Sequence, residues 1–183
     1  MWQLLVIAVI VIAAVMSYNS LVRLRESGDA AWADIDVQLK RRYDLIPNIV
    51  ETVKGYASHE RETLESVVAA RSGAMSAQGP EAKAQAEGVL AGAMKSLFAL
   101  AEAYPDLQAA GGFRDLQGTL GQIEEQLSQA RRYYNAVVRD FNTKTQTFPS
   151  VLIARSFGFA EREFFEVAEL EKAVPRVSFG DDD

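Results

Sequence analysis

The sequence predicts an all-α protein with an N-terminal transmembrane helix, an antiparallel four-helix bundle and a C-terminal aromatic tail. Three observations predict this fold. The run from Trp2 to Met16 is apolar and uncharged, long stretches after it repeat apolar residues at steps of three and four, and Gly and Pro separate those stretches. We expect a transmembrane anchor over residues 1–17, the bundle over 18–147, and the aromatic segment with its acidic end over 148–183.

The apolar N-terminal run is at the short end of the length that crosses a membrane. Extended to Tyr18, it counts roughly 17 residues, or about 25 Å as a helix. A cleaved signal peptide is the alternative, but no Lys or Arg precedes the run and no small–x–small cleavage site follows it. We therefore predict an uncleaved anchor that includes Leu5 and Ile10, with Trp2 and Tyr18 at the two membrane interfaces.

The positive charges near the anchor lie on its C-terminal side. Arg23 and Arg25 come first, and Lys40, Arg41 and Arg42 follow. The positive-inside rule then predicts an N-terminus outside the cell and a bulk that faces the cytoplasm. No helix breaker follows the anchor closely, so we expect it to run directly into the first bundle helix and to hold the body in a fixed orientation.

The first bundle helix is predicted from Ala31, Ile35 and Leu39, which share one apolar face. Pro47 lacks a backbone N–H and suits the first turn of a helix, where Asp44 would serve as the cap. Proline also disfavours helical geometry at the residue before it. We therefore predict a tight break between Asp44 and Pro47.

Two further helices are predicted between this break and the long C-terminal helix. The second runs from about 47 to 72, and the segment GAMSAQGP over 73–80 ends it because Gly and Pro interrupt helices. The third begins near Glu81 and closes at Pro105, and its many alanines favour helix and allow close packing.

The fourth helix has the most regular apolar pattern of the chain, at alternating steps of three and four. Its members are Phe113, Leu116, Leu120, Ile123, Leu127, Ala130, Tyr134, Val137 and Phe141. A seam of this length is typical of a coiled-coil dimer, but three similar helices on the same chain favour packing within one bundle.

The tail is rich in phenylalanine, and we expect it to make contacts through Phe157, Phe159, Phe164 and Phe165. Such a set of aromatic side chains needs cover from water. One interpretation is that the tail folds back over the bundle and completes its core. The alternatives are docking on a neighbouring subunit and packing at the lipid interface.

Two sets of polar residues in the predicted helices are candidates for contacts. A dense charged set beside the apolar stripe of the first helix is a candidate interaction face, although a solvated helix surface is the simpler interpretation. Asn135 and Asn142, one heptad apart, are predicted either to set the register between helices or to lie on the surface. The charged set comprises Asp34, Asp36, Lys40, Arg41, Arg42 and Asp44.

The composition argues against several classes of function. A net charge of −6 and a pI near 4.9 argue against nucleic-acid binding. The chain has no cysteine, and its one histidine, His59, lies in a polar stretch where a solvated helix residue is expected. One histidine is too few for a di-iron bundle. We predict no catalytic, cofactor-binding or metal-binding residues, and no enzyme activity.

The segment AWADIDVQLKRRYDLIPNIVETVKGYA, over residues 31–57, resembles the signature of the LemA family of bacterial membrane proteins. Weaker similarities are Tyr18-Asn19, the pair Tyr133-Tyr134 with Asn135, and Phe148-Pro149, so the resemblance covers about residues 18–179. It implies an N-terminal membrane helix followed by an antiparallel helical bundle, located in the bacterial inner membrane, with no established reaction. One branch of the family, associated with magnetosomes, takes part in forming membrane compartments.

Together these observations predict a self-assembling scaffold, a homo-oligomer in contact with membrane lipids that organises or shapes the membrane. Tethering to a membrane raises effective concentration and so favours assembly. The alternative is a membrane-tethered adaptor or regulator of a partner membrane protease or signalling protein.

Overall fold

The computed structural model describes residues 1–166, and this part of the chain consists of helices and short connections without a strand. The predicted all-α class is thus confirmed. The acidic end of the predicted tail lies outside the described residues, and the division of the chain into three parts stays a prediction. The helices are α1 (Trp2–Tyr56), α2 (Arg61–Ser76), α3 (Pro80–Ala101), α4 (Pro105–Ala109), α5 (Gly111–Gln146) and α6 (Ser150–Phe157).

The N-terminal helix α1 continues without interruption through Pro47, so the predicted break between Asp44 and Pro47 is wrong. The missing N–H of Pro47 leaves the carbonyl of Tyr43, four residues earlier, without its helical donor. The Arg71 side chain on α2 replaces that donor, because its Nε lies 2.7 Å from the Tyr43 oxygen. A long-range contact, which local sequence does not reveal, keeps the helix intact.

The first turn of the chain therefore comes about ten residues later than predicted. Helix α1 ends at Tyr56, and α2 begins at Arg61 instead of Pro47. His59 lies exposed in the turn between the two helices. The predicted solvent exposure of His59 is confirmed, but its predicted position within a helix is wrong. Helix α3 ends at Ala101, and Pro105 begins the short helix α4.

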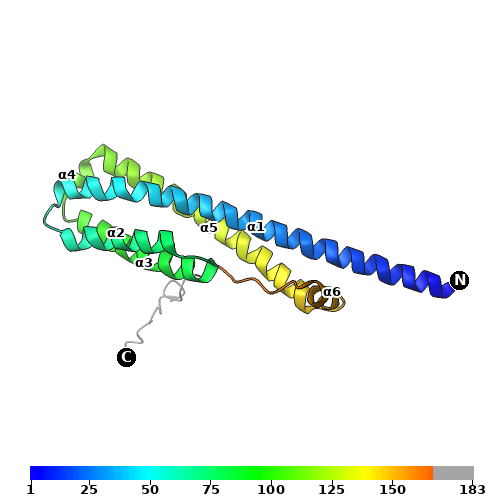
Figure 1. Ribbon diagram of the computed structural model, residues 1–183. Coiled ribbons are helices and arrows are strands. Elements are labelled where there is room, and N and C mark those ends of the chain that lie inside the picture. The colour runs from blue at the N-terminus through cyan, green and yellow to red at the C-terminus, as the bar shows by residue number, and fades with distance from the viewer. Residues whose placement is uncertain (167–183) are drawn as a thin grey trace, which may run out of the picture.

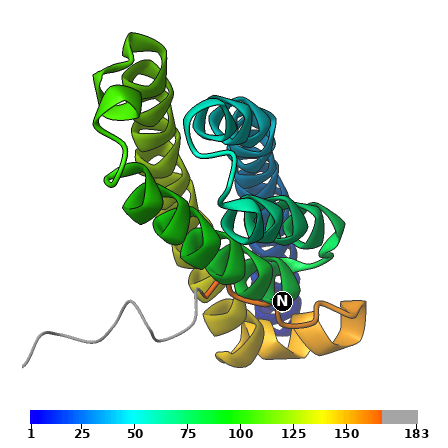
Figure 2. The same ribbon diagram turned by 90° about the vertical axis from the view of Figure 1, so that its left-hand side faces the viewer.

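The four longer helices, α1, α2, α3 and α5, form two antiparallel pairs (Figure 1). The long helices α1 and α5 run side by side in opposite directions, and α2 packs along α3 at the end of the molecule away from the N-terminus. Figure 2, a view from that end, shows α2 and α3 packed against the α1–α5 pair. The N-terminal part of α1 projects beyond the other helices.

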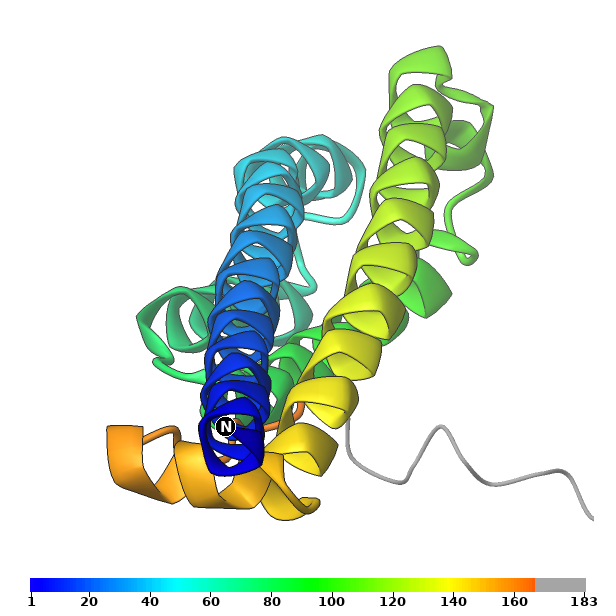
Figure 3. The same cartoon turned by 90° about the vertical axis from the view of Figure 1, so that its right-hand side faces the viewer.

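The buried side chains form two clusters along this body. The main core takes residues from α1 to α5, among them Ile35, Leu97 and Tyr134, and Phe165 of the tail completes it. A smaller cluster of Leu21, Phe141 and Ala154 joins α1, α5 and α6 nearer the N-terminal end. Helix α6 lies crosswise to α1 at this level (Figure 3).

Candidate functional site

The N-terminal part of α1 is exposed throughout and has no packing partner within the described residues. Trp2, Leu5 and Ile10 stand exposed, and Tyr18 is the first aromatic side chain that contacts the body. Among residues 1–166, α1 is the one helix that is long and apolar enough to cross a membrane. Its exposed apolar surface is consistent with a membrane protein, because such a surface is unfavourable in water.

A buried ion pair joins α3 to α1 in the part of the molecule away from the N-terminus. Arg42 Nη1 lies 2.6 Å from Glu87 Oε2, and the two side chains are only 4% and 1% exposed. Charges removed from water in this way are tolerated only when paired and hydrogen-bonded. Glu87 therefore fixes the α2–α3 pair against the anchor helix.

The Tyr43 hydroxyl satisfies the second oxygen of the same carboxylate. It donates a hydrogen bond of 2.5 Å to Glu87 Oε1 and lies 3.3 Å from the Ala74 carbonyl of α2. Burial raises the pKa of Tyr43 far above its usual value, and the hydrogen bond to Glu87 raises it further. Tyr43 is thus a neutral donor that connects three helices.

Two more side chains of α5 complete the surroundings of this ion pair. Arg42 Nε lies 2.9 Å from Glu124 Oε1, and Arg131 Nη2 lies 3.9 Å from Glu87 Oε2. The Arg131 guanidinium also stacks over the Phe165 ring, 4.9 Å from its centroid. The network therefore extends from α3 through α1 and α5 to the tail.

The predicted charged face divides between surface and interior. Arg42 is buried in the network described above, so its assignment to an accessible interaction face is corrected. Sequence could not separate it from Arg41, because its partner Glu87 is 45 residues away. Asp34, Asp36 and Lys40 are exposed, and Arg41 and Asp44 border an open groove of about 400 Å³ between α1 and α5.

The chain after α6 forms an extended strap, residues 158–166, that runs back along α5. Gly158 has a φ of +71°, a left-handed conformation that few other residues adopt, and it ends α6. The amide N–H of Phe159 closes this helix end by donating to the Ala154 carbonyl at 2.9 Å.

Asn135 and Asn142 hold the strap by matching its backbone. The Asn142 side-chain amide donates to the Arg162 carbonyl and accepts from its N–H, both at 2.9 Å. Asn135 makes the same pair of bonds with Phe165, at 3.0 and 2.9 Å. Seven helical residues rise about 10.5 Å and three extended residues about 10 Å, so the two asparagines match the strap's spacing. They position the tail on a helix, not one helix on another.

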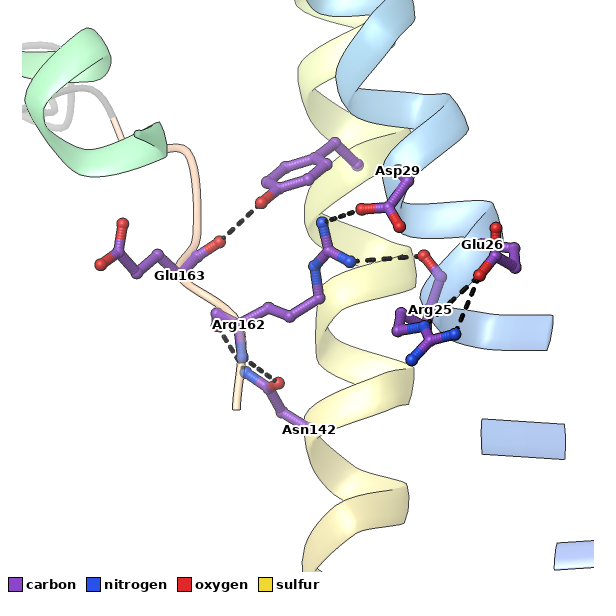
Figure 4. A network of polar contacts seen from close by, with 7 residues as sticks. Arg25, Glu26, Asp29, Asn142, Arg162 and Glu163 are labelled. Atoms are coloured by element: carbon purple, nitrogen blue, oxygen red, sulfur yellow. Dashed lines mark hydrogen bonds and ion pairs between the residues drawn. The ribbon is translucent and has the colours of Figure 1, made fainter. Parts of the chain in front are cut away.

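Arg162 connects the strap to α1, as Figure 4 shows. Its Nη2 lies 2.7 Å from Asp29 Oδ1, and its Nη1 lies 3.3 Å from the Arg25 carbonyl. The guanidinium lies over Gly28, where a Cβ would be in ordinary van der Waals contact with it at 3.4 Å. Burial alone would lower the pKa of Arg162, but the interactions with Asp29 and Tyr134 together leave the pKa above its usual value.

The four tail phenylalanines lie at different depths. Phe165 is buried against Trp32, whose ring also contacts that of Tyr134, and Phe164 is partly buried at the edge of the main core. Phe159 packs on the smaller cluster, with its ring 6.3 Å from that of Phe141. Phe157 contacts Tyr18 but remains exposed.

The site has the character of a structural junction. Within residues 1–166 no group of His, Asp and Glu side chains is arranged to hold a metal ion. The sequence did not predict a role for Glu87, which binds Arg42 and Tyr43, or for Arg71, which donates to the Tyr43 carbonyl that Pro47 leaves without a donor. A charged residue within the alanine-rich pattern of the third helix was the one available signal for Glu87.

An apolar projecting helix, joined without a break to a helical body, defines a class of candidate membrane-anchored helical proteins. Residues 31–179 match the model of the LemA family, and the chain belongs to this family. The predicted family membership is confirmed.

Several characterised relatives resemble the chain at low identity. Magnetosome protein MamQ 2 of Paramagnetospirillum magneticum AMB-1 is 24% identical over 89% of this chain and 71% of its own length. Magnetosome protein MamQ of Magnetospirillum gryphiswaldense MSR-1 is 25% identical over 82% of this chain and 65% of its own length. Protein LemA of Metamycoplasma hominis is 26% identical over 84% and 71%, respectively.

Proposed function

We propose that the protein is a non-enzymatic, single-pass scaffold that self-assembles and organises or shapes the bacterial inner membrane. Its N-terminus lies outside and its bulk in the cytoplasm, according to the positive charges that follow the anchor. One observation carries the proposal: α1 is a single helix from Trp2 to Tyr56, so the membrane segment and the body share one rigid axis. Molecules anchored in this way share one orientation relative to the bilayer.

The packing around α1 supports a rigid connection. Arg162 of the strap binds the backbone and Asp29 of α1 just after the anchor, and Phe157 and Phe159 contact Tyr18. These contacts resist bending where the helix leaves the membrane. Tethering confines the molecules to two dimensions and raises their effective concentration, which lets weak contacts between copies drive assembly.

The outer surface of the α2–α3 pair offers such contacts. Val68 and Met75 of α2 and Val89 of α3 are large apolar side chains that stand exposed. Relatives named as magnetosome proteins add support for a role in membrane organisation. Scattered apolar residues are normal on a surface, so their part in assembly requires a direct test.

A membrane-tethered adaptor is the second candidate, favoured by the groove beside the charged face. Arg41 and Asp44 of α1 and Gln122 and Gln126 of α5 supply both signs of charge and neutral polar groups around an apolar floor. A segment of a partner membrane protease or signalling protein would suit this lining. An adaptor would form large particles only together with that partner.

The mass of the purified protein separates the two candidates. We would extract the full-length chain in mild detergent and compare it with a chain that begins at Ser17, by light scattering and electron microscopy. A third protein, with Trp2–Met16 replaced by a polyleucine segment of equal length, separates tethering from contacts specific to this anchor.

The scaffold predicts large regular particles for the full-length chain, and their loss without the anchor. Retention of particles with polyleucine would assign assembly to tethering and to the body. Monomers or dimers in all three samples would contradict the scaffold. They would direct attention to the groove, where the double substitution Arg41→Glu and Asp44→Lys should then abolish partner capture.

A further inference from the structure

Helix α6 lies beside the point where the apolar segment of α1 meets the body. Figures 1 and 3 show it crosswise to α1, at the end of the body nearest the N-terminus. The rings of Phe157 and Tyr18 are in contact, with centroids 4.8 Å apart. An almost wholly apolar groove of about 230 Å³ lies between the helices, lined by Ala14, Val15, Tyr18, Ile153 and Phe157.

Two large apolar side chains of α6, Leu152 and Phe157, stand exposed, whereas Ile153 packs on the smaller cluster and Val151 is half-buried. The buried residues of α6 are the small Ser150 and Ala154, whereas Leu152 and Phe157 are 57% and 63% exposed. Phe148, just before the helix, is 81% exposed. In a water-soluble helix the larger apolar residues occupy the buried face, so this distribution indicates that something else covers them.

We propose that α6 rests in the headgroup region of the bilayer that α1 crosses, with Leu152 and Phe157 inserted at the acyl boundary. The inference rests on the proposed membrane anchoring and names the lipid surface as the partner of this helix. A short amphipathic helix lying in the plane of the interface is a common mode of membrane contact.

Continuity identifies lipid as the occupant. The exposed apolar surface of α1 passes into the α6 surface through the groove at Ala14 and Val15, so both surfaces share one environment. If α1 stands across the membrane, a helix crosswise to it lies along the membrane plane. Tyr18 then sits at the depth that aromatic side chains prefer.

The charges around this junction suit anionic headgroups. Arg155 is the one charged residue of α6 and is exposed, and Arg23 and Arg25 follow on α1 within two turns of Tyr18. Basic side chains at this depth are attracted to the anionic lipids of the cytoplasmic leaflet. Anchoring at both α1 and α6 would fix the rotation of the body about the α1 axis as well as its height.

Fluorescence quenching in vesicles tests the placement of α6. The chain has no cysteine, so each single-cysteine variant carries one environment-sensitive label. Labels at Leu152→Cys and Phe157→Cys probe α6, Ile10→Cys probes the anchor, and Tyr56→Cys, at the end of α1 far from the anchor, is an exposed control at 47%. The full-length proteins are placed in phosphatidylcholine–phosphatidylglycerol vesicles containing lipids with a nitroxide near the headgroup or deep in the chain.

We expect the emission maximum of the labels at residues 152 and 157 to shift to shorter wavelength in vesicles, and the nitroxide near the headgroup to quench their fluorescence. The label at residue 10 should be quenched by the deep quencher, and that at residue 56 by neither. Quenching at residue 10 without quenching at 152 and 157 would overturn the α6 placement while leaving the anchor intact. Absence of quenching at residue 10 would overturn both.

A water-soluble quencher identifies any other occupant. Labels at 152 and 157 that are shielded from aqueous iodide but are not quenched by either nitroxide lipid would lie against protein, such as a second copy of this chain. That result would also overturn the proposal. Free access of iodide to both positions would do the same, because it would place α6 in water.

Discussion

The two ends of the molecule are held to α1 by different kinds of interaction. At the end far from the N-terminus, the α2–α3 pair is fixed by a buried ion pair, Arg42 with Glu87. Near the anchor, the strap is held by the neutral amides of Asn135 and Asn142 and by an ion pair, Arg162 with Asp29, that is partly open to solvent.

This difference predicts how the stability of each end responds to amino-acid substitutions. Removing one partner of a buried pair leaves an uncompensated charge, so the far end should fail as a unit. The strap is held by separate bonds, each of modest energy, and should loosen in steps. Single substitutions should therefore cost less stability in the strap than at the buried ion pair.

The largest effect is expected from Glu87→Ala, which removes the buried partner of Arg42 and leaves it the partly exposed Glu124. We expect a loss of about 3–5 kcal/mol in the free energy of unfolding, measured by urea titration of helical circular dichroism. The double variant Arg42→Met with Glu87→Leu should recover much of that loss, because both charges of the buried pair are removed together and the Tyr43 hydroxyl keeps the Ala74 carbonyl as an acceptor. A loss below about 1 kcal/mol for Glu87→Ala would show that the ion pair is not buried as described.

Asn135→Ala and Asn142→Ala should each cost about 1–3 kcal/mol, because two backbone groups of the strap lose their partners. Trypsin cleavage after Arg162 should accelerate, most in the double variant, while the rest of the protein stays folded. Gln129→Ala, at an exposed position of the same helix, is the matched control. Equal cleavage in the control and the variants would contradict the strap's mode of attachment.

The bond between Arg71 and the Tyr43 carbonyl should matter only because of Pro47. We expect Arg71→Met to cost about 1–3 kcal/mol in the native sequence, and less in a Pro47→Ala background, where the helix regains its own N–H donor. A double-mutant cycle measures this coupling. Strict additivity of the two substitutions would refute the explanation for the unbroken helix.

The smallest effect is a pH dependence at alkaline pH. The raised pKa of Tyr43 means that the folded state retains its proton, so the stability it contributes is present below about pH 10 and is lost above it. Tyr43→Phe should reduce the slope of stability against pH there by up to about 1.4 kcal/mol per pH unit. An unchanged slope would mean that Tyr43 titrates normally.

The sequence predicted those parts of the fold that depend on local pattern. The apolar segment, the seam of α5 and the start of α3 at Pro80 all follow from periodicity and from helix-start signals within a few residues. The sequence did not predict that α1 continues through Pro47, because the replacement donor, Arg71, comes from another helix. Local rules for proline describe a helix on its own, and a tertiary contact overrode them here.

The contacts of the site were predicted less completely. The sequence shows that Asn135 and Asn142 are seven residues apart. It does not show that this spacing matches three residues of extended chain, because no pattern marks residues 158–166 as a strap. Arg42 and Arg41 look alike in sequence and separate only when Glu87 is placed beside one of them. Pairing over such distances is a property of the fold.

If the anchor and the body form one rigid unit, the distance between a spin label on each of them has a single value. Labels at Ile10→Cys and Val68→Cys, both exposed, would be measured in lipid nanodiscs with labelled protein diluted into unlabelled protein. A variant with a glycine–serine insertion after Ser17 supplies the flexible reference. A rigid unit gives one narrow distance distribution for the native chain, whereas a distribution as broad as that of the insertion variant would mean that the anchor and the body move independently.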